Sequence, residues 1–318
     1  MSPQKPIFIG TDEIALQLEK LRKSTSEPLA GLFGPNTMTW RVSRESALFL
    51  GAGRALLLLL AHPWVAHAIA EHSRTLGDRI GRFHRTFDLT FTMIFGTLDQ
   101  AVGAALRLHR RHAAIDGLLP NAIGTFAKGS AYRANEVAAL RWVHSTLLET
   151  TIVVHDLILT PLTADERDRL YAESRKYGAL FGIPEDLMPD QWADFVAYNE
   201  AMLSSNTLTV GDTAREVAAE IFAPQQAGWK MPRWYLDLTA HLLPKTLCSA
   251  FSFDYGQVER EGAERAIAWI RWFYPMLPPS LRYVGPYHEA VGRLAGRTVP
   301  DHLTQWLNRM WIGRRQLR

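Results

Sequence analysis

One apolar run, residues 46–70, limits the folds open to this chain more than any other segment. It reads SALFLGAGRALLLLLAHPWVAHAIA, and Arg54, His62 and Pro63 interrupt it. A transmembrane helix needs about 20 consecutive, predominantly apolar residues, and these interruptions leave no such stretch. Helices that are apolar nearly all round are core elements of large folds. We therefore predict two buried helices that meet at His62 and Pro63.

Helical periodicity and helix end signals dominate the rest of the chain. Residues typical of helix N-caps and helix C-termini separate the apolar stripes. They are Thr163 with Glu166, Gly182, Pro189 with Asp190, and Thr213. The first pair has the spacing of a capping box, Gly182 ends the helix that follows, and the last two positions open further helices. Alternating strand patterns with Asn-Gly or Asp-Gly turns are absent. The predicted fold is all-α, a single multi-helical globular domain.

Predicted breaks between helices divide the chain without any long linker or internal repeat. They fall at residues 24–39, 117–131, 182–189, 223–232 and 275–286. We expect a lead-in segment over 1–40, a core over 41–290, and a C-terminal helix with a basic tail over 291–318. The last residues, IGRRQLR, are expected to form a solvated tail.

Bulk composition excludes several classes of protein. The 318 residues carry a net charge of +3 without a long basic run, so nucleic acid is not an expected partner. The single cysteine, Cys248, excludes an intramolecular disulfide framework and sites built from several cysteines. The start, MSPQKPIFIGTDEI, lacks the pattern of a secretory signal. A reducing compartment, the cytoplasm, is the expected location.

Common catalytic and metal motifs are missing from the chain. We find no HExxH, no Glu-x-x-His pair, no Walker loop, no complete GxGxxG and no Gly-x-Ser-x-Gly elbow. His62, His67 and His72 are spaced by five, which turns each about 140° from the last on one helix. These three imidazoles therefore do not converge on one metal.

Two helical stripes combine functional side chains with apolar residues. The first runs through RFHRTFDLTFTMIFGT and consists of Arg82, Arg85, Thr86, Leu89, Met93 and Gly96. It places two guanidiniums and a hydroxyl next to bulk apolar groups, and a buried arginine needs an anionic partner. The second runs through AVGAALRLHRRHAAIDG and carries His112 beside Leu108 and Ala105.

A third stripe, in NEVAALRWVHSTLLET, has His144 at its centre. Either histidine alone has the pattern of a hydrogen-bonded core residue as well as that of a ligand. A porphyrin requires an axial imidazole, cations for its propionates and an apolar slot for its ring. The three stripes together supply all of these groups.

In their order along the chain, these segments resemble a known enzyme family. GAGRALLLLLAHPWVAHAIAEHS, RFHRTFDLTFTMIFGT, RRHAAIDG, YRANEVAALRWVHSTLLET and LTADERDRLYAES are similar to the successive motifs of the rubber-oxygenase (latex clearing protein) and MpaB oxygenase family. The similarity extends from about residue 45 to about residue 290. It implies an all-α fold that encloses heme b.

The resemblance also implies roles for single residues. His112, in HAAIDG, matches the axial heme ligand, and His144, in WVHSTL, is the alternative ligand or a pocket residue. Arg82-Phe-His-Arg85-Thr86 matches a distal Arg-x-x-Lys-Thr segment, with arginine in place of the lysine that can cap the iron. Because arginine stays protonated in proteins, Arg85 is a poor iron ligand. We expect it to hold a propionate, steer oxygen or pair with substrate, with Met93 also lining the cofactor site.

Four neighbouring residues have open assignments. His84 faces either the pocket or the surface, and Asp116 either orients His112 or is a solvated carboxylate at a helix end. Glu71 and His72 fall near the position of an acid in the rubber-cleaving branch, where the alignment is loose.

The resulting expectation is a heme-b-dependent oxygenase that uses O2 on a hydrophobic, isoprenoid or lipid-like substrate. The alternatives are a non-catalytic heme protein and a helical protein that binds an apolar ligand or a partner without metal. The stretch AIAWIRWFYPMLPP, residues 266–279, predicts a buried helix that ends in a proline turn. Its other interpretation is peripheral membrane contact through Trp269, Trp272 and the basic C-terminus.

Overall fold

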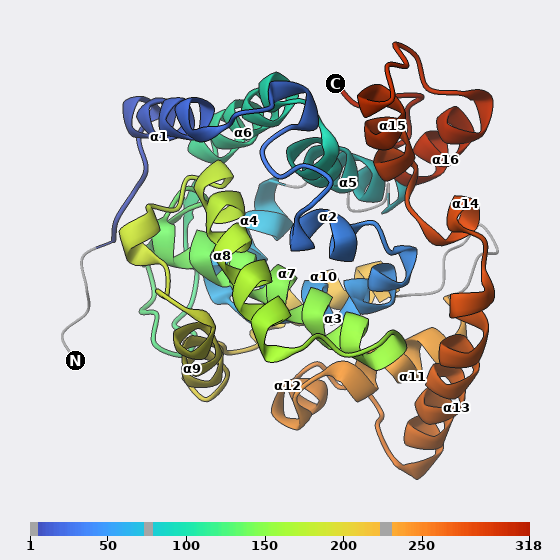
Figure 1. Ribbon diagram of the computed structural model, residues 1–318. Coiled ribbons are helices and arrows are strands. Elements are labelled where there is room, and N and C mark those ends of the chain that lie inside the picture. The colour runs from blue at the N-terminus through green and yellow to red at the C-terminus, as the bar shows by residue number, and fades with distance from the viewer. Residues whose placement is uncertain (1–5, 73–78, 223–230) are drawn as a thin grey trace.

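The chain forms a helical protein, as the sequence predicts. The computed structural model describes residues 6–72, 79–222 and 231–318, which contain sixteen α-helices and one two-stranded sheet (Figure 1). The first helices are α1 (Thr11–Ser24), α2 (Met38–Ser43), α3 (Ala52–Leu60), α4 (Pro63–His72), α5 (Arg79–Phe95), α6 (Leu98–Ala113), α7 (Val137–Ile158) and α8 (Ala164–Leu180). The others are α9 (Trp192–Leu203), α10 (Asp212–Phe222), α11 (Arg233–Leu242), α12 (Lys245–Ala250), α13 (Gln257–Phe273), α14 (Pro279–Arg282), α15 (Gly285–Leu294) and α16 (His302–Ile312). Short 3-10 helices are η1 (Pro28–Ala30), η2 (Ser46–Gly51), η3 (Glu185–Leu187) and η4 (Tyr274–Met276).

The predicted helix ends are partly confirmed. The Thr163 hydroxyl accepts from the Glu166 N–H, and the Glu166 carboxylate accepts from the Thr163 N–H at 3.0 Å, which completes the capping box of α8. Gly182 follows α8 with φ of +88°. The predicted start of α10 at Thr213 is wrong, because α10 begins at Asp212. The Thr213 hydroxyl lies 3.2 Å from Nε2 of His67 instead of capping the helix.

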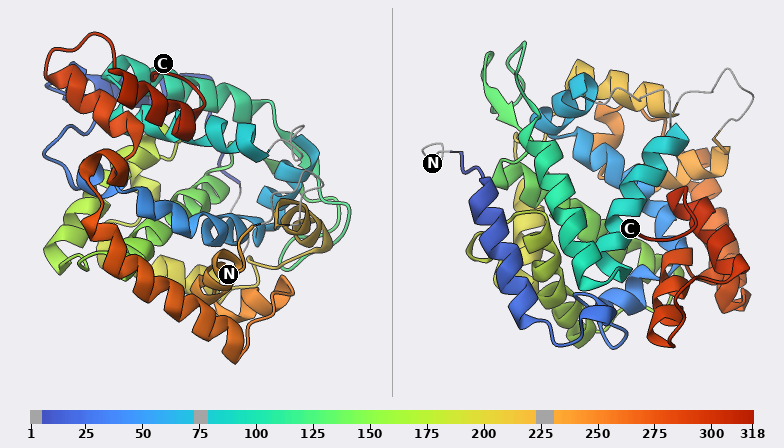
Figure 2. Two further views of the ribbon diagram at one scale, coloured as in Figure 1. Left: turned by 90° about the vertical axis from the view of Figure 1, so that its right-hand side faces the viewer. Right: turned by 90° about the horizontal axis from the view of Figure 1, so that it is seen from above.

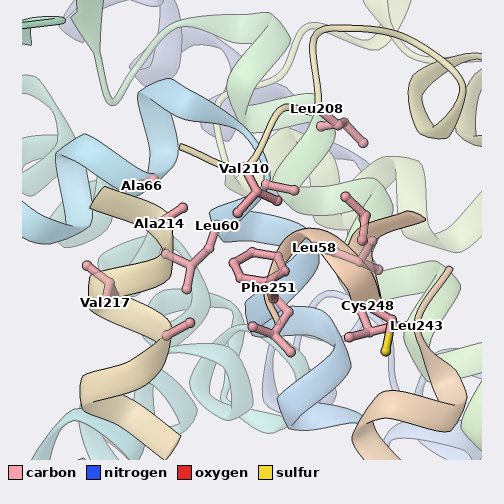
Figure 3. Packing of buried hydrophobic residues seen from close by; sticks show 14 of the residues in the cluster. Leu58, Leu60, Ala66, Leu208, Val210, Ala214, Val217, Leu243, Cys248 and Phe251 are labelled. Carbon is pink, nitrogen blue, oxygen red and sulfur yellow. The ribbon is translucent and has the colours of Figure 1, made fainter. Parts of the chain in front are cut away.

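The apolar run folds as two helices that meet at the predicted break. α3 ends at Leu60 and α4 begins at Pro63. Leu57, Leu58 and Leu60 are almost fully buried in a cluster with the helices that follow (Figure 3). Among the described residues, no single helix is long and apolar enough to span a membrane; the pair Ser46–Leu60 and Pro63–His72 passes that test only jointly and is bent by 103°.

α7 lies in the middle of the fold (Figure 1). Its 22 residues contact α2, α3, α8, α13 and η2, so it is buried on several sides. Next to it, α5 and α6 form an antiparallel hairpin that is joined through Gly96 and Thr97.

A small sheet lies in the predicted break at 117–131. β1 (Asp116–Leu118) pairs antiparallel with β2 (Ala131–Arg133), with Gly117 opposite Tyr132. A Cβ atom on Gly117 would lie 2.4 Å from the Tyr132 hydroxyl oxygen, so glycine is needed for this close approach. Three residues a strand are too few for an alternating pattern to stand out in the sequence.

The C-terminal segment is docked through Ile312 and Leu317, whereas residues 313–316 and Arg318 are exposed, so the expectation of a solvated tail is only partly correct. Leu317 is 2% exposed and packs with Phe91, Phe95 and Ile312. Its N–H donates to the Glu289 carboxylate at 3.1 Å, and its carbonyl accepts from Gln100 at 3.2 Å. Figure 2 shows α15, α16 and the end of the chain against α5 and α6. In the sequence, Leu317 is a single apolar residue among charged and polar ones, and this pattern did not predict that the segment packs against α5 and α6.

The helix predicted at the start of 266–279 is present, but it is not buried. α13 ends at Phe273, and Pro275 and Pro278 follow it, which confirms the proline turn. Trp269 and Trp272 are 61% and 66% exposed. The aromatic content of this stretch indicated core packing, whereas only the opposite face of the helix enters the core.

Candidate functional site

His112 is in the last turn of α6, the helix that packs against α5. Its side chain is half-buried, and no described residue hydrogen-bonds to its ring nitrogens. Burial, helped by nearby His109 and Arg111, lowers the pKa of His112 from its ordinary 6.5 to about 4. The imidazole is therefore neutral at pH 7, the form that can donate a lone pair to a metal.

The first residues of α5 are less buried than their stripe predicts. Met93 is fully buried, in a cluster that includes Leu140 and Tyr177. Arg85 and Thr86 are exposed, and the side chain of Arg82 lies outside the described part of the structure. The expectation of buried arginines is thus wrong for Arg85, because the early turns of α5 are covered on the side of His84 and not at Arg85.

The remaining side of α5 is covered by the C-terminal helix. The His84 ring lies 3.1 Å, through Nε2, from the carbonyl oxygen of Met310 in α16. Asp88 forms an ion pair with Arg314 at 3.3 Å, and burial raises the pKa of this carboxyl group. The structure therefore assigns His84 to the contact with the C-terminal helix.

His144 is enclosed in the core at the centre of α7. It is 1% exposed, and its Nε2 atom lies 2.9 Å from the carbonyl oxygen of Ser174 in α8. Because a carbonyl accepts, Nε2 carries the proton and Nδ1 has a free lone pair. Nδ1 is buried and has no hydrogen-bond partner among the described residues. Burial lowers the pKa of His144 to about 4.

The two candidate ligands belong to different environments. Tyr177, on α8, lies against His144 with ring centroids 6.2 Å apart. No hydrogen bond or ring contact between described residues links His144 to His112. The structure therefore presents two separate neutral imidazoles.

Glu71, His72 and Asp116 gather where α4 meets the small sheet. The Tyr132 hydroxyl donates to the Glu71 carboxylate at 2.6 Å, and Nε2 of His72 lies 3.0 Å from the backbone oxygen of Asp116. Burial and then Glu71 raise the pKa of Tyr132. The Asp116 side chain is exposed and does not contact His112 through any described hydrogen bond. This agrees with a solvated carboxylate.

The three histidines at the α3–α4 break and in α4 have different partners. His62 is buried beside Trp64 and Phe126, and burial lowers its pKa to about 4. His67 contacts Pro63 and Thr213, whereas His72 reaches the sheet. Within the described ranges, no three His, Cys, Asp or Glu side chains could hold one metal ion.

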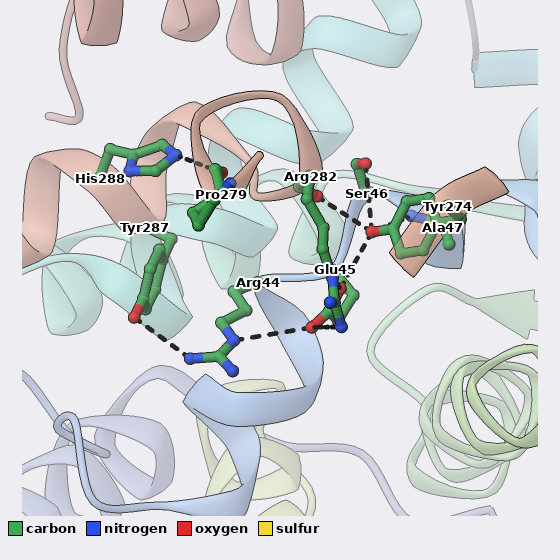
Figure 4. Close-up of polar contacts among 9 residues, drawn as sticks. All are labelled: Arg44, Glu45, Ser46, Ala47, Tyr274, Pro279, Arg282, Tyr287 and His288. Atoms are coloured by element: carbon green, nitrogen blue, oxygen red, sulfur yellow. Dashed lines mark hydrogen bonds and ion pairs between the residues drawn. The ribbon is translucent and has the colours of Figure 1, made fainter. Parts of the chain in front are cut away.

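A buried polar cluster around Glu45 was not predicted (Figure 4). Glu45 is 3% exposed and accepts from Arg282 twice, at 2.7 and 3.0 Å. The Tyr274 hydroxyl donates to the same carboxylate at 3.0 Å and accepts from the Ala47 N–H at 3.1 Å. Arg44 lies over the ring of Tyr283 at 4.4 Å. No local spacing signals partners so far apart in the sequence.

Comparison with known protein families identifies the family to which the chain belongs. The sequence model described as ER-bound oxygenase mpaB/B'/Rubber oxygenase, catalytic domain, matches residues 40–272. The match covers more than half of the chain, and the chain belongs to this family of oxygenase catalytic domains. The matched region contains α3 to α7 and both candidate histidines. Neither the curated proteins nor the solved structures provide a match.

Proposed function

We propose that this protein is a heme-b-dependent oxygenase that acts on a hydrophobic substrate, with His112 as the axial ligand. The observation that supports this most directly is the neutral His112 imidazole at the end of α6, inside the region that matches the oxygenase family. Family membership supports oxygenase activity in general. The cofactor, its ligand and the hydrophobic substrate are our proposals.

The side chains of His112, Arg82 and Arg85 have the chemistry that heme b requires. Neither ring nitrogen of His112 is hydrogen-bonded by a described residue, so one is available to iron and the other to an orienting partner. Arg82 and Arg85 carry permanent charge, which suits propionate or substrate carboxylate groups. Bound heme supplies the redox chemistry with O2.

The chain's own residues have the remaining tasks in this proposal. A guanidinium is a cation with no free lone pair, so Arg85 would orient and neutralise anions instead of ligating iron. The Thr86 hydroxyl, one residue further, can donate a hydrogen bond on the same helix end. Met93 belongs to an apolar cluster that excludes water from the inner part of α5.

His144 is the second candidate ligand, and a specific observation favours it. A metal-binding histidine usually donates its other ring N–H to a carbonyl or carboxylate, which fixes the tautomer. The bond from His144 to Ser174 has this arrangement and leaves Nδ1 buried with a free lone pair. The environment differs from that of His112, because apolar residues of α6, α7 and α8 pack closely there.

The first test is the visible spectrum of the protein expressed with a heme precursor. We expect a Soret band near ~400 nm at one heme per chain, which shifts when the reduced protein binds CO. Protein that stays colourless during hemin titration contradicts the proposal. It would favour a helical protein that binds an apolar ligand or a partner without metal.

Catalysis needs a separate measurement, because a heme carrier or sensor would give the same spectrum. We expect the purified heme protein to consume O2 in the presence of an unsaturated hydrophobic substrate such as a polyisoprene oligomer. Full heme loading without O2 consumption on any such substrate would support the non-catalytic alternative.

A further inference from the structure

A hollow on the surface, beside α16 and the end of the chain, is lined by cations. It has a volume of about 390 Å³, a size typical of sites for small organic molecules. Its lining residues are Val299, Gln305, Arg314, Arg315, Gln316 and Arg318. None of them is an aspartate or a glutamate, so the charged side chains that line the hollow are all guanidiniums.

The positive charge at the hollow is only partly neutralised. Arg315 and Arg318 are exposed, and neither side chain forms an ion pair with a described carboxylate. Arg314 pairs with Asp88 at 3.3 Å. Burial raises the pKa of this carboxyl group, whereas the charges of Arg314, Arg107 and Arg318 lower it. Several guanidiniums thus lie near a single carboxyl group, and the hollow keeps a surplus of positive charge.

The backbone that carries these arginines is fixed at three points. The side chain of Leu317 is 2% exposed in the core cluster of α5 and α16. The Asn308 amide donates to the carbonyl oxygen of Arg315 at 3.1 Å. The backbone oxygen of Arg318, the last residue of the sequence, accepts from Arg107 at 3.1 Å. The fold therefore keeps like charges next to one another, and an ordered backbone reduces the entropy that a ligand's binding costs.

We propose that this hollow binds a small organic molecule through a phosphate group. A guanidinium forms two parallel hydrogen bonds with a phosphate or a carboxylate. Three guanidiniums and two glutamine amides line the hollow, and they supply more donors than the two oxygens of a carboxylate accept. A phosphate monoester has three terminal oxygens and about two negative charges. Val299, which is 61% exposed, offers an apolar contact to the organic part of the ligand.

This site is distinct from the proposed heme site in the residues that form it. The lining residues fall between 299 and 318, outside the matched region 40–272, and they include neither candidate histidine. The proposal is independent of heme, so its failure would leave the proposed oxygenase function unchanged.

Isothermal titration calorimetry of the full chain with pyrophosphate tests the proposal. We expect saturable binding that weakens as the salt concentration rises, and weaker binding of malonate, a dicarboxylate. In Arg315→Gln/Arg318→Gln the Kd for pyrophosphate should rise about tenfold or more, because two guanidiniums are lost. Arg82 and Arg85, which the proposed function gives to propionates, remain in this variant. A loss of binding therefore belongs to the hollow.

The matched control is Arg169→Gln/Arg265→Gln. It removes the same charge from α8 and α13, away from the end of the chain in Figure 1. Each of these exposed arginines pairs with a carboxylate four residues before it. The control should bind pyrophosphate as the parent does, and unchanged urea midpoints must show that both variants are folded.

Co-sedimentation with vesicles that contain phosphatidic acid distinguishes the two sources of such a phosphate group. Vesicle binding that pyrophosphate displaces indicates a lipid headgroup, and its absence indicates a free organic phosphate. The proposal is overturned if the parent does not bind pyrophosphate, or if malonate binds as tightly. It is also overturned if Arg315→Gln/Arg318→Gln binds as the parent does, or if the control loses binding to the same extent.

Discussion

The Nε2 atom of His144 lies 2.9 Å from the carbonyl oxygen of Ser174, and this contact ties α7 to α8 inside the core. His112 has no comparable partner among the described residues and is only half-buried. Histidine thus has a structural contact in α7, whereas in α6 its ring has no hydrogen-bond partner among the described residues.

This difference predicts opposite effects of two substitutions. His112→Ala should lose heme while the apo protein keeps its thermal stability, because the ring makes no described hydrogen bond. His144→Ala should retain heme but lose about 2 kcal/mol of stability, because the Ser174 carbonyl loses its donor and a cavity remains. The heme-to-protein ratio and the free energy of unfolding check both. Loss of heme in His144→Ala alone would identify His144 as the ligand.

Acid should destabilise the protein below pH 6.5. Burial lowers the pKa of His62 and of His144 from 6.5 to about 4, so the folded state binds fewer protons than the unfolded state between these values. Stability is complete above pH 6.5 and falls as the pH approaches 4. Each of these two histidines should account for about 2 kcal/mol of loss at pH 5.

His62→Phe tests this assignment, because the ring already packs against Trp64 and Phe126. We expect similar stability to the parent at pH 7.5 and a smaller loss at pH 5, measured by urea unfolding at both values. An unchanged pH dependence would mean that His62 is protonated equally in the folded and unfolded states.

Arg282→Met should be strongly destabilising. It leaves the Glu45 carboxylate buried without its guanidinium, which costs about 3 kcal/mol in comparable pairs. Arg297→Met is the control, because it breaks an exposed pair with Asp301 and should cost less than about 1 kcal/mol. Equal urea midpoints for the two variants would show that Glu45 is solvated in the folded protein.

Leu317→Ser should weaken the contact of the C-terminal segment with α5 and α6. Loss of this buried side chain should cost about 2 kcal/mol. Leu303→Ser, at a half-exposed position of α16, should stay within about 0.5 kcal/mol of the parent. Denaturant unfolding of both variants measures the difference. Identical curves would indicate that Leu317 does not stay in its cluster in solution.

Local chemistry explains which features the sequence could predict. Thr163 caps α8 through a contact three residues away, and His144 is buried because its stripe repeats at helical spacing. The helices and their apolar faces follow from such short-range patterns. The β1–β2 pair is too short for such a pattern to reveal it.

Long-range contacts account for what the sequence did not reveal. The helical periodicity predicts which face of α5 is apolar. It does not predict which turns of that face the neighbouring helices bury, so the exposure of Arg85 was not predicted. The lowered pKa of His112 comes first from burial, which a pattern of residue types along the chain does not measure. Trp269 and Trp272 have the composition of core residues, and only packing shows that they face outward.

The bond between Glu45 and Arg282 joins two residues 237 positions apart in the chain. The family match ends at residue 272, so a fragment cut to its boundaries would retain the carboxylate and discard the guanidinium. It would also discard the Val284 N–H that donates to the carbonyl of Arg44 at 2.9 Å. Contacts that hold the N-terminal part of the matched region thus come from outside it, and we expect expression fragments to need the chain beyond α14.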